Sequence, residues 1–247
     1  MNLSGKHVVI TGGGSGVGAE TARQFAKAGA KVTIMGRSKA PLLEQNLPYQ
    51  ICDVTDAASV AKAFAKARGD NGPIAIAIAN AGAADSKPFA KMTSADLTAS
   101  LYVNLTGVFH TWQTALPDMI DTGAGRLIAI ASTAGLKGYP YVSAYCAAKH
   151  GVVGLTRALA VELGRTGITV NAICPGFVET PLLERSITNI IDKTGMSRDK
   201  AEASLKRGNP QNRFIQSDEV AGTALWLCSD AAKSVNGHAL TLSGGEI

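Results

Sequence analysis

Short apolar segments alternate with amphipathic segments along almost the whole chain. The apolar runs have the length of β-strands, and the amphipathic stretches, of about 12 to 20 residues, have the length of helices. Residues 73–79 read Pro-Ile-Ala-Ile-Ala-Ile-Ala and are apolar on both faces, which is typical of a strand buried in a parallel sheet. The alternation therefore predicts an α/β fold with a doubly wound parallel sheet.

The segments can be assigned along the chain. We expect strands at residues 6–11, 31–35, 50–52, 73–79, 126–131, 168–174 and 239–242. We expect helices at residues 16–29, 56–68 (with Asp56 as N-cap), 94–121, 143–165 and 217–229. Residues 180–212 break the alternation with polar, irregular sequence and some helical fragments, and are too long for a simple connection. The sequence thus predicts one Rossmann-type domain over residues 1–247, with about seven strands, helices on both faces and a substrate lid at about 180–212.

The composition is that of a globular protein. Of the 247 residues, 46% are hydrophobic and 17% are charged, and no apolar run approaches the length of a membrane span. The N-terminal residues run into the first strand without an apolar leader, and the four cysteines have neither disulfide nor zinc spacing. We therefore expect a cytoplasmic protein without a membrane partner.

The net charge of +5 does not point to nucleic acid, because the basic residues are dispersed apart from a basic stretch at 193–213. A small molecule that carries phosphate accounts for a mild positive excess. The four histidines are scattered and form no ligand cluster, so we expect no metal site.

A glycine-rich turn joins the first strand to the first helix, in the pattern T-G-x-x-x-G-x-G. Glycines let the backbone approach a pyrophosphate, and the free N–H groups of a helix N-terminus face the anion. The turn therefore predicts a dinucleotide site, although such a turn can also serve tight packing alone. The residues expected to contact the cofactor here are Gly12, Ser15, Gly16, Val17 and Gly18.

Tyr145 and Lys149 lie four residues apart, and Ser132 lies thirteen residues before the tyrosine. Positions i and i+4 share one face of a helix, so the ammonium can lie beside the phenol and favour the phenolate. Lowering a tyrosine pKa from about 10 to neutral pH takes about 4 kcal/mol. We expect this free energy to come from Lys149, a positive charge on a cofactor and partial desolvation together. The Tyr-x-x-x-Lys pattern alone also arises by chance.

Five features together resemble the short-chain dehydrogenase/reductase family. They are the turn of Thr11, Gly12, Gly16 and Gly18; Asn80-Ala81-Gly82; Asn104; Ser132 with Tyr145 and Lys149; and Pro175-Gly176 with Thr180. The resemblance covers essentially the whole chain. Within the family, the chain is similar to 3-oxoacyl thioester reductases. It implies an enzyme of the oxidoreductase class that interconverts a ketone and a secondary alcohol with a nicotinamide cofactor.

The resemblance also implies roles for individual residues. Tyr145 is the expected general acid/base, Lys149 lowers its pKa and binds the nicotinamide ribose, and Ser132 orients the substrate oxygen. Asn104 holds a water that links Lys149 to solvent. The remaining expected cofactor contacts are Asp53 and Val54 at the adenine, Asn80 and Gly82 at the adenosine ribose, and Pro175, Gly176, Val178 and Thr180 at the carboxamide. Alternatively, Ser132 ends a strand, Asn104 satisfies a helix kink and Asp53 caps a turn.

The residues after the second strand indicate the cofactor. Members of the family that prefer NAD usually have an acidic residue where this chain has Gly36, followed here by Arg37 and Ser38. A guanidinium binds the 2′-phosphate of NADP, and such a contact is worth roughly ten- to hundredfold in affinity. The sequence therefore favours NADP(H) over NAD(H), with Ser15 standing where many NADP-binding relatives have a second basic residue. Alternatively, Arg37 is a solvated residue that stacks on adenine.

The sequence says less about the substrate than about the cofactor. The segment 180–212 is apolar around residues 182–191 and basic from residue 193 onward, which suits a 3-oxoacyl thioester of coenzyme A or acyl carrier protein. His110 stands where carrier-protein reductases often have arginine. The alternatives are a free cyclic, aromatic or aliphatic ketone and, outside enzymes, a nucleotide-sensing regulator. By resemblance, we expect the helices at about 94–121 and 143–165 to pair between subunits in a homotetramer or homodimer.

Overall fold

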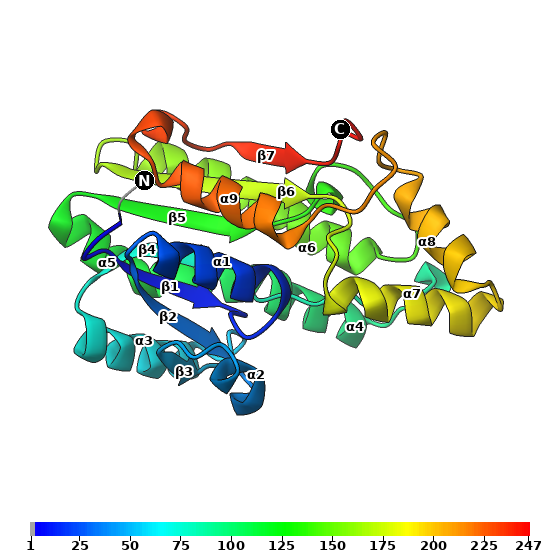
Figure 1. The fold of residues 1–247 in the computed structure, drawn as a ribbon, viewed down its shortest axis with the longest axis horizontal. Helices are drawn as coiled ribbons and strands as arrows, with labels where there is room; N and C mark the ends of the chain where they lie inside the picture. The colour runs from blue at the N-terminus through cyan, green and yellow to red at the C-terminus, as the bar shows by residue number, and fades with distance from the viewer. Residues whose placement is uncertain (1–2) are drawn as a thin grey trace.

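The seven strands of residues 3–247, the part of the chain that the structure describes, pair in parallel in one sheet (Figure 1). The structure is a computed structural model, and its strand order is β3-β2-β1-β4-β5-β6-β7. The strands are β1 (His7–Thr11), β2 (Lys31–Gly36), β3 (Tyr49–Ile51), β4 (Ile74–Ala79), β5 (Gly125–Ile130), β6 (Ile168–Pro175) and β7 (Ala239–Leu242). The predicted doubly wound parallel sheet is confirmed. The chain reverses its winding direction between β1 and β4, where such sheets bind ligands beyond the carboxyl ends of their strands.

Helices cover both faces of this sheet, as predicted. The longer helices are α1 (Gly16–Lys27), α3 (Ala57–Asn71), α4 (Ser94–Leu101), α5 (Gly107–Thr122), α6 (Ser143–Glu162), α7 (Pro181–Thr194), α8 (Arg198–Lys206) and α9 (Ser217–Leu227). One buried cluster joins α3, α5 and α6 to the sheet, and a second cluster joins α1 and α9 to the opposite face. Because helices cover both faces of the sheet, its inner strands are buried on both sides, which explains their short, apolar sequences.

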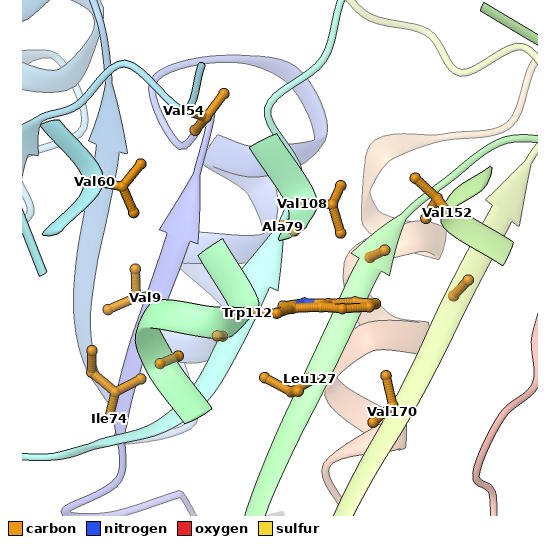
Figure 2. Packing of buried hydrophobic residues seen from close by; sticks show 14 of the residues in the cluster. Val9, Val54, Val60, Ile74, Ala79, Val108, Trp112, Leu127, Val152 and Val170 are labelled. Atoms are coloured by element: carbon orange, nitrogen blue, oxygen red, sulfur yellow. The ribbon is translucent and has the colours of Figure 1, made fainter. Parts of the chain in front are cut away.

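Trp112 of α5 fills the centre of the first cluster. Its indole is 1% exposed and lies among Val108, Leu127 and Val170 in Figure 2. Burying an aromatic side chain of this size is worth about 1.5–3 kcal/mol in transfer free energy. This packing holds α5 against the sheet at β4 and β5, and so places the residues that lead into α5.

The structure differs from the sequence expectation at the long helix predicted over residues 94–121. The helix is interrupted by a π-helical turn, η2 (Tyr102–Thr106), between α4 and α5. Gly107 follows the turn, and a Cβ there would lie 2.7 Å from the side chain of Val54. The close approach of Gly107 to the loop after β3 therefore fixes where α5 begins.

The segment 180–212 is more ordered than its sequence predicts, because it contains α7 and α8. These helices share a small apolar cluster of Leu183, Ile187, Ala201 and Phe214. A short helix, α2 (Lys39–Leu43), was not expected either, while the predicted Asp56 cap is confirmed, since its carboxylate accepts from Ala58 N at 2.9 Å. The remaining short turns are η1 (Phe89–Lys91), η3 (Thr133–Gly135) and η4 (Asp230–Ala232). Within residues 3–247 no helix combines the length and apolar character needed to cross a bilayer.

Candidate active site

The polar residues singled out in the sequence gather at the carboxyl edge of the sheet. The strands end on the same side in Figure 1, because they are parallel. The glycine-rich turn follows β1, Asn80 follows β4, Ser132 follows β5 and Gly176 follows β6. Helix α6 then brings Tyr145 and Lys149 to this edge, since both residues lie on its first two turns.

Ser132, Tyr145 and Lys149 form one contiguous group. The Ser132 hydroxyl is close enough to the Tyr145 phenol to act on its pKa, and it accepts from Ala134 N at 3.1 Å. Lys149 Nζ lies 5.6 Å from the centroid of the Tyr145 ring and donates to the carbonyl of Ile130 at 2.8 Å. The predicted i, i+4 placement therefore holds a buried ammonium beside the phenol.

The pKa values of this group correct one expectation. Burial raises the pKa of Tyr145 to about 12, and the hydrogen bond from Ser132 acts in the opposite direction. Desolvation therefore opposes formation of the phenolate instead of helping it, because burial disfavours the charged form of an acid. Burial also lowers the pKa of Lys149 to about 8, so the ammonium still predominates at pH 7.

Asn104 lies on the π-helical turn and is buried. Its Oδ1 accepts from Ala83 N at 3.1 Å, and its Nδ2 donates to the carbonyls of Ala83 at 2.8 Å and Ser100 at 3.1 Å. Gly82 lies between Asn104 and Lys149, since a Cβ at Gly82 would be 2.9 Å from Asn104 Oδ1 and 3.9 Å from Lys149 Nζ. The side-chain amide thus satisfies backbone groups, as the structural alternative held, and it does so next to Lys149.

The glycine-rich turn is built for close approach of a ligand to the backbone. Gly12 and Gly16 have φ values of +67° and +53°, a region that favours glycine. Asn80 fixes the turn by donating to the carbonyls of Thr11 at 3.0 Å and Gly12 at 3.1 Å. Ser15 is the N-cap of α1, and within residues 3–247 it makes no side-chain cap hydrogen bond. The first N–H groups of α1 therefore suit a pyrophosphate, which fits a dinucleotide at this turn.

The expected adenosine end lies after β2 and β3. Arg37 and Ser38 are exposed, and the Arg37 guanidinium is close enough to Asp53 to help hold the pKa of that carboxyl low. The main cause of that low pKa is hydrogen bonding from Thr55, whose N and Oγ1 lie 2.9 and 2.7 Å from Asp53 Oδ1. Asp53 thus caps a turn, as the alternative held.

Val54 is buried, and its carbonyl lies 2.9 Å from His110 Nδ1. His110 therefore ties α5 to the loop after β3. This contact gives a structural reason for the histidine at a position where carrier-protein reductases often have arginine.

The residues after β6 connect the cofactor turn to the segment 180–212. Thr180 caps α7, with its hydroxyl 3.4 Å from Leu183 N, and its Cγ2 is 3.2 Å from where a Cβ of Gly16 would be. Val178 forms a parallel bridge with Ile215, and Gly176 N donates to Leu242 O at 3.0 Å. Pro175 ends β6 and is buried. Of the residues expected at the carboxamide, Thr180 therefore lies beside the glycine-rich turn, and the others lie in the same segment after β6.

Two of the six basic residues of the segment 180–212, Arg198 and Lys206, form ion pairs within it. Arg198 binds Glu184 at 2.7 Å and Glu202 at 2.8 Å, and Lys206 binds Glu202 at 3.2 Å. Arg213 binds Glu219 at 2.7 Å. Three basic residues of the stretch 193–213 are thus paired with glutamates, which reduces the positive charge that this stretch offers to an anionic substrate.

Three contacts at this edge were not predicted. Asn189 Nδ2 of α7 donates to Ser86 Oγ at 2.7 Å, and Lys193 Nζ donates to Ser86 O at 3.3 Å, so α7 lies against the segment after β4. Glu246, which follows β7, accepts from Tyr139 at 2.7 Å. Nothing in the sequence pattern marks these pairs, since their partners are more than 100 residues apart. The described part of the chain brings no three metal-ligating side chains together.

Comparison with known proteins agrees with this geometry. The family model for short chain dehydrogenases matches residues 6–190. The D-beta-hydroxybutyrate dehydrogenase of Rhizobium meliloti is 36% identical over 97% of this chain and 98% of its own length. The levodione reductase of Leifsonia aquatica is also 36% identical, over 97% of this chain and 93% of its own length. The structure of a variant of actinorhodin polyketide ketoreductase with NADPH matches with a TM-score of 0.93 and 34% identity, over 98% of this chain and 97% of that one. The chain therefore belongs to the short-chain dehydrogenase family of oxidoreductases, whose members bind a nicotinamide cofactor.

Proposed function

We propose that the protein reduces a ketone to a secondary alcohol with NADP(H), with Tyr145 as the group that protonates the substrate oxygen. The observation that carries this proposal is the contact of Tyr145 with Ser132 beside the buried Lys149 ammonium. When bound, the nicotinamide cofactor supplies the hydride. Ser132 orients the carbonyl oxygen, Tyr145 gives it a proton, and Lys149 holds the ribose and favours the phenolate that remains. Asn104 supports the return of a proton to this group from solvent.

The segment 180–212 is the proposed lid over this site, because α7 lies against Ser86 and begins beside the glycine-rich turn. The proposed cofactor residues are those of the turn, of the adenosine end and of the loop after β6 described above. The free cysteine thiols support a location in the reducing cytoplasm.

We favour a 3-oxoacyl thioester, on coenzyme A or acyl carrier protein, as the substrate. The similarity to a polyketide ketoreductase supports this choice. The second candidate is a free cyclic, aromatic or aliphatic ketone, which the internal pairing of Arg198 and Arg213 favours, because paired charges attract an anionic carrier less. The similarity to a relative named levodione reductase, at 36% identity, also supports this second candidate.

The test is a panel of 3-oxoacyl thioesters and free ketones, assayed for NADPH oxidation and for the alcohol product. Turnover of acyl thioesters well above that of free ketones supports the first candidate. If the thioesters are inert and cyclic or aromatic ketones are reduced, the second candidate replaces it.

Arg37 is the proposed determinant of NADP(H) preference, and Gly36→Asp tests it. A Cβ at Gly36 would meet its nearest neighbour, Leu42, at 3.5 Å, so the chain accommodates a side chain there. The new carboxylate repels a 2′-phosphate and accepts from a ribose 2′-OH. We expect the ratio of kcat/KM for NADPH to that for NADH to fall roughly 10- to 100-fold.

Gly36→Ala is the matched control for this substitution, because it adds the Cβ without the charge. It is expected to keep the preference of the unmodified protein. Equal use of NADPH and NADH by the unmodified protein would remove the role given to Arg37.

A homotetramer or homodimer is the proposed assembly. The outer faces of η2, α5 and α6 form an apolar groove lined by Leu105, Thr106, Phe109, Gly151, Gly154, Leu155 and Ala158. Small residues on α6 let a second helix approach closely. Apart from the neighbouring residues and backbone of α6 itself, no atom of the described chain lies within 4 Å of a Cβ built on Gly154, so Gly154→Leu is tolerated within one subunit.

We expect Gly154→Leu to shift the protein to a smaller assembly in size-exclusion chromatography with light scattering, because the larger side chain fills the groove. Gly69→Leu on α3 is the control, since a Cβ on Gly69 is equally open. A Gly154→Leu protein of unchanged mass would show that the groove is not a subunit interface.

A further inference from the structure

The segment after β7 returns to the active-site edge and buries a carboxylate there. Figure 1 shows the C-terminal end of the described chain at the carboxyl end of β7, beside the connection from α8 to α9. Glu246 lies in this segment, and its side chain is 6% exposed. A carboxylate is rarely buried without partners, so its contacts identify what it holds.

One oxygen of Glu246 holds the loop that follows Ser132. Glu246 Oε1 lies 2.7 Å from Lys137 Nζ and accepts a hydrogen bond of 2.7 Å from the Tyr139 hydroxyl. Tyr139 Oη is also 2.7 Å from Thr133 Oγ1. A hydroxyl has one proton, so the Tyr139 proton goes to Glu246 and Thr133 donates to Tyr139. Burial raises the pKa of Tyr139, which keeps it a donor at neutral pH.

The chain of contacts leads to Ser132. Thr133 is the first residue of η3, and Ser132 is its N-cap. Gly135 holds the other side of η3 against α6, since a Cβ there would be 2.7 Å from the carbonyl of Lys149. The turn that carries Ser132 is thus fixed between α6 and the segment after β7.

The same carboxylate lies against two further loops of the site. A Cβ on Gly208, between α8 and α9, would be 2.7 Å from Glu246 Oε1, and a Cβ on Gly176 would be 3.5 Å from Oε2. The Tyr139 ring also packs edge-on against Phe177, with centroids 6.3 Å apart. Glu246 therefore joins the loops that follow β5, β6 and α8.

We infer that Glu246 is a positioning residue that holds Ser132 in contact with Tyr145 through Tyr139 and Thr133. The inference rests on the proposed function for its kinetic consequences, but the ordering of the loop is a property of the protein alone. When Glu246 is removed, the loop at 132–142 loses its outer support and Ser132 no longer keeps a fixed distance to Tyr145.

The variants Glu246→Ala and Tyr139→Phe break this connection, and Glu246→Gln keeps an oxygen that accepts both hydrogen bonds. Asp118→Asn is the matched control, because Asp118 is similarly buried, binds Arg68 at 2.8 Å and accepts from Ile74 N at the opposite edge of the sheet. It removes a buried carboxylate without touching the loop at 132–142.

Hydrogen exchange measured by mass spectrometry is the first readout. We expect faster exchange in residues 132–142 for Glu246→Ala and Tyr139→Phe, and native exchange there for Glu246→Gln and Asp118→Asn. Native exchange in Glu246→Ala would overturn the inference. This readout needs no substrate, so its failure is distinct from a failure of the proposed reaction.

Kinetics give the second readout. Misplacing one catalytic contact lowers rates by roughly 10- to 100-fold, so we expect kcat of Glu246→Ala to fall by that factor with little change in the KM for the cofactor. The apparent pKa of alcohol oxidation should rise, because the interaction with Ser132 is one of the contributions that lower the pKa of Tyr145. We expect Glu246→Gln to keep a kcat near that of the unmodified protein, because it retains the accepting oxygen. A lower melting temperature with native kcat and native pH profile would instead assign Glu246 a purely structural role.

Discussion

Tyr145→Phe is expected to lower kcat for ketone reduction by about 10²- to 10⁴-fold, the usual contribution of a general acid/base. The phenylalanine ring fills the same space but has no proton to give, and Ser132 loses its partner. Cofactor affinity, measured by fluorescence titration with NADPH, should change little. The measurement is steady-state NADPH oxidation at saturating ketone.

Tyr141→Phe is the control for this substitution. Tyr141 lies in the loop that leads into α6, but it is 64% exposed, so removal of its hydroxyl is expected to leave kcat unchanged. Activity of Tyr145→Phe within tenfold of the unmodified protein would show that another group moves the proton.

Lys149→Met is expected to abolish most activity and yet to stabilise the fold. The folded protein lowers the pKa of Lys149 from 10.5 to about 8, so burying its charge costs about 3 kcal/mol at pH 7. Methionine has a similar length and no charge. The carbonyl of Ile130 loses its donor, which offsets part of the gain and leaves a net stabilisation of about 1–2 kcal/mol.

The sign of the pH dependence follows from the lowered pKa. The penalty is full below pH 8, where Lys149 is protonated in both the folded and the unfolded state. Between about pH 8 and pH 10.5 the unfolded state binds more protons, so the unmodified protein regains stability as the pH rises. The advantage of Lys149→Met in urea unfolding should therefore shrink between pH 7 and about pH 9.5.

Lys66→Met on the exposed surface of α3 is the control, with an expected change within about 0.5 kcal/mol. A Lys149→Met protein that is less stable than the unmodified one at pH 7 would contradict the account. The result matters for function, because it would mean that the chain retains a destabilising charge where its proposed chemistry needs one.

The sequence predicted the sheet and the position of the site because both depend on local patterns. Apolar runs such as 73–79 read as buried strands whatever their partners, and the carboxyl ends of parallel strands meet at one edge. The spacing of Tyr145 and Lys149 on α6 is a property of one helix. Ser132 could be placed because it directly follows a strand.

The rest depends on contacts between distant segments. The π-helical turn at Asn104 has no residue pattern of its own, and follows from the packing of Gly107 on Val54. The basic residues after Lys193 suggested a charged rim, but the sequence does not show that Arg198 and Arg213 are paired with glutamates. The direction in which burial moves the pKa of Tyr145 also required the structure.

The pH dependence of alcohol oxidation with NADP⁺ tests the central role of Tyr145 most directly. The protein alone holds the pKa of this phenol near 12, so positive charge at the site must lower it for the reaction to run at neutral pH. We predict that kcat rises through one ionisation with an apparent pKa below 10, and that this ionisation is absent from the residual activity of Tyr145→Phe. A rate that is independent of pH, or the same ionisation in Tyr145→Phe, would contradict the assignment of Tyr145 as the acid/base.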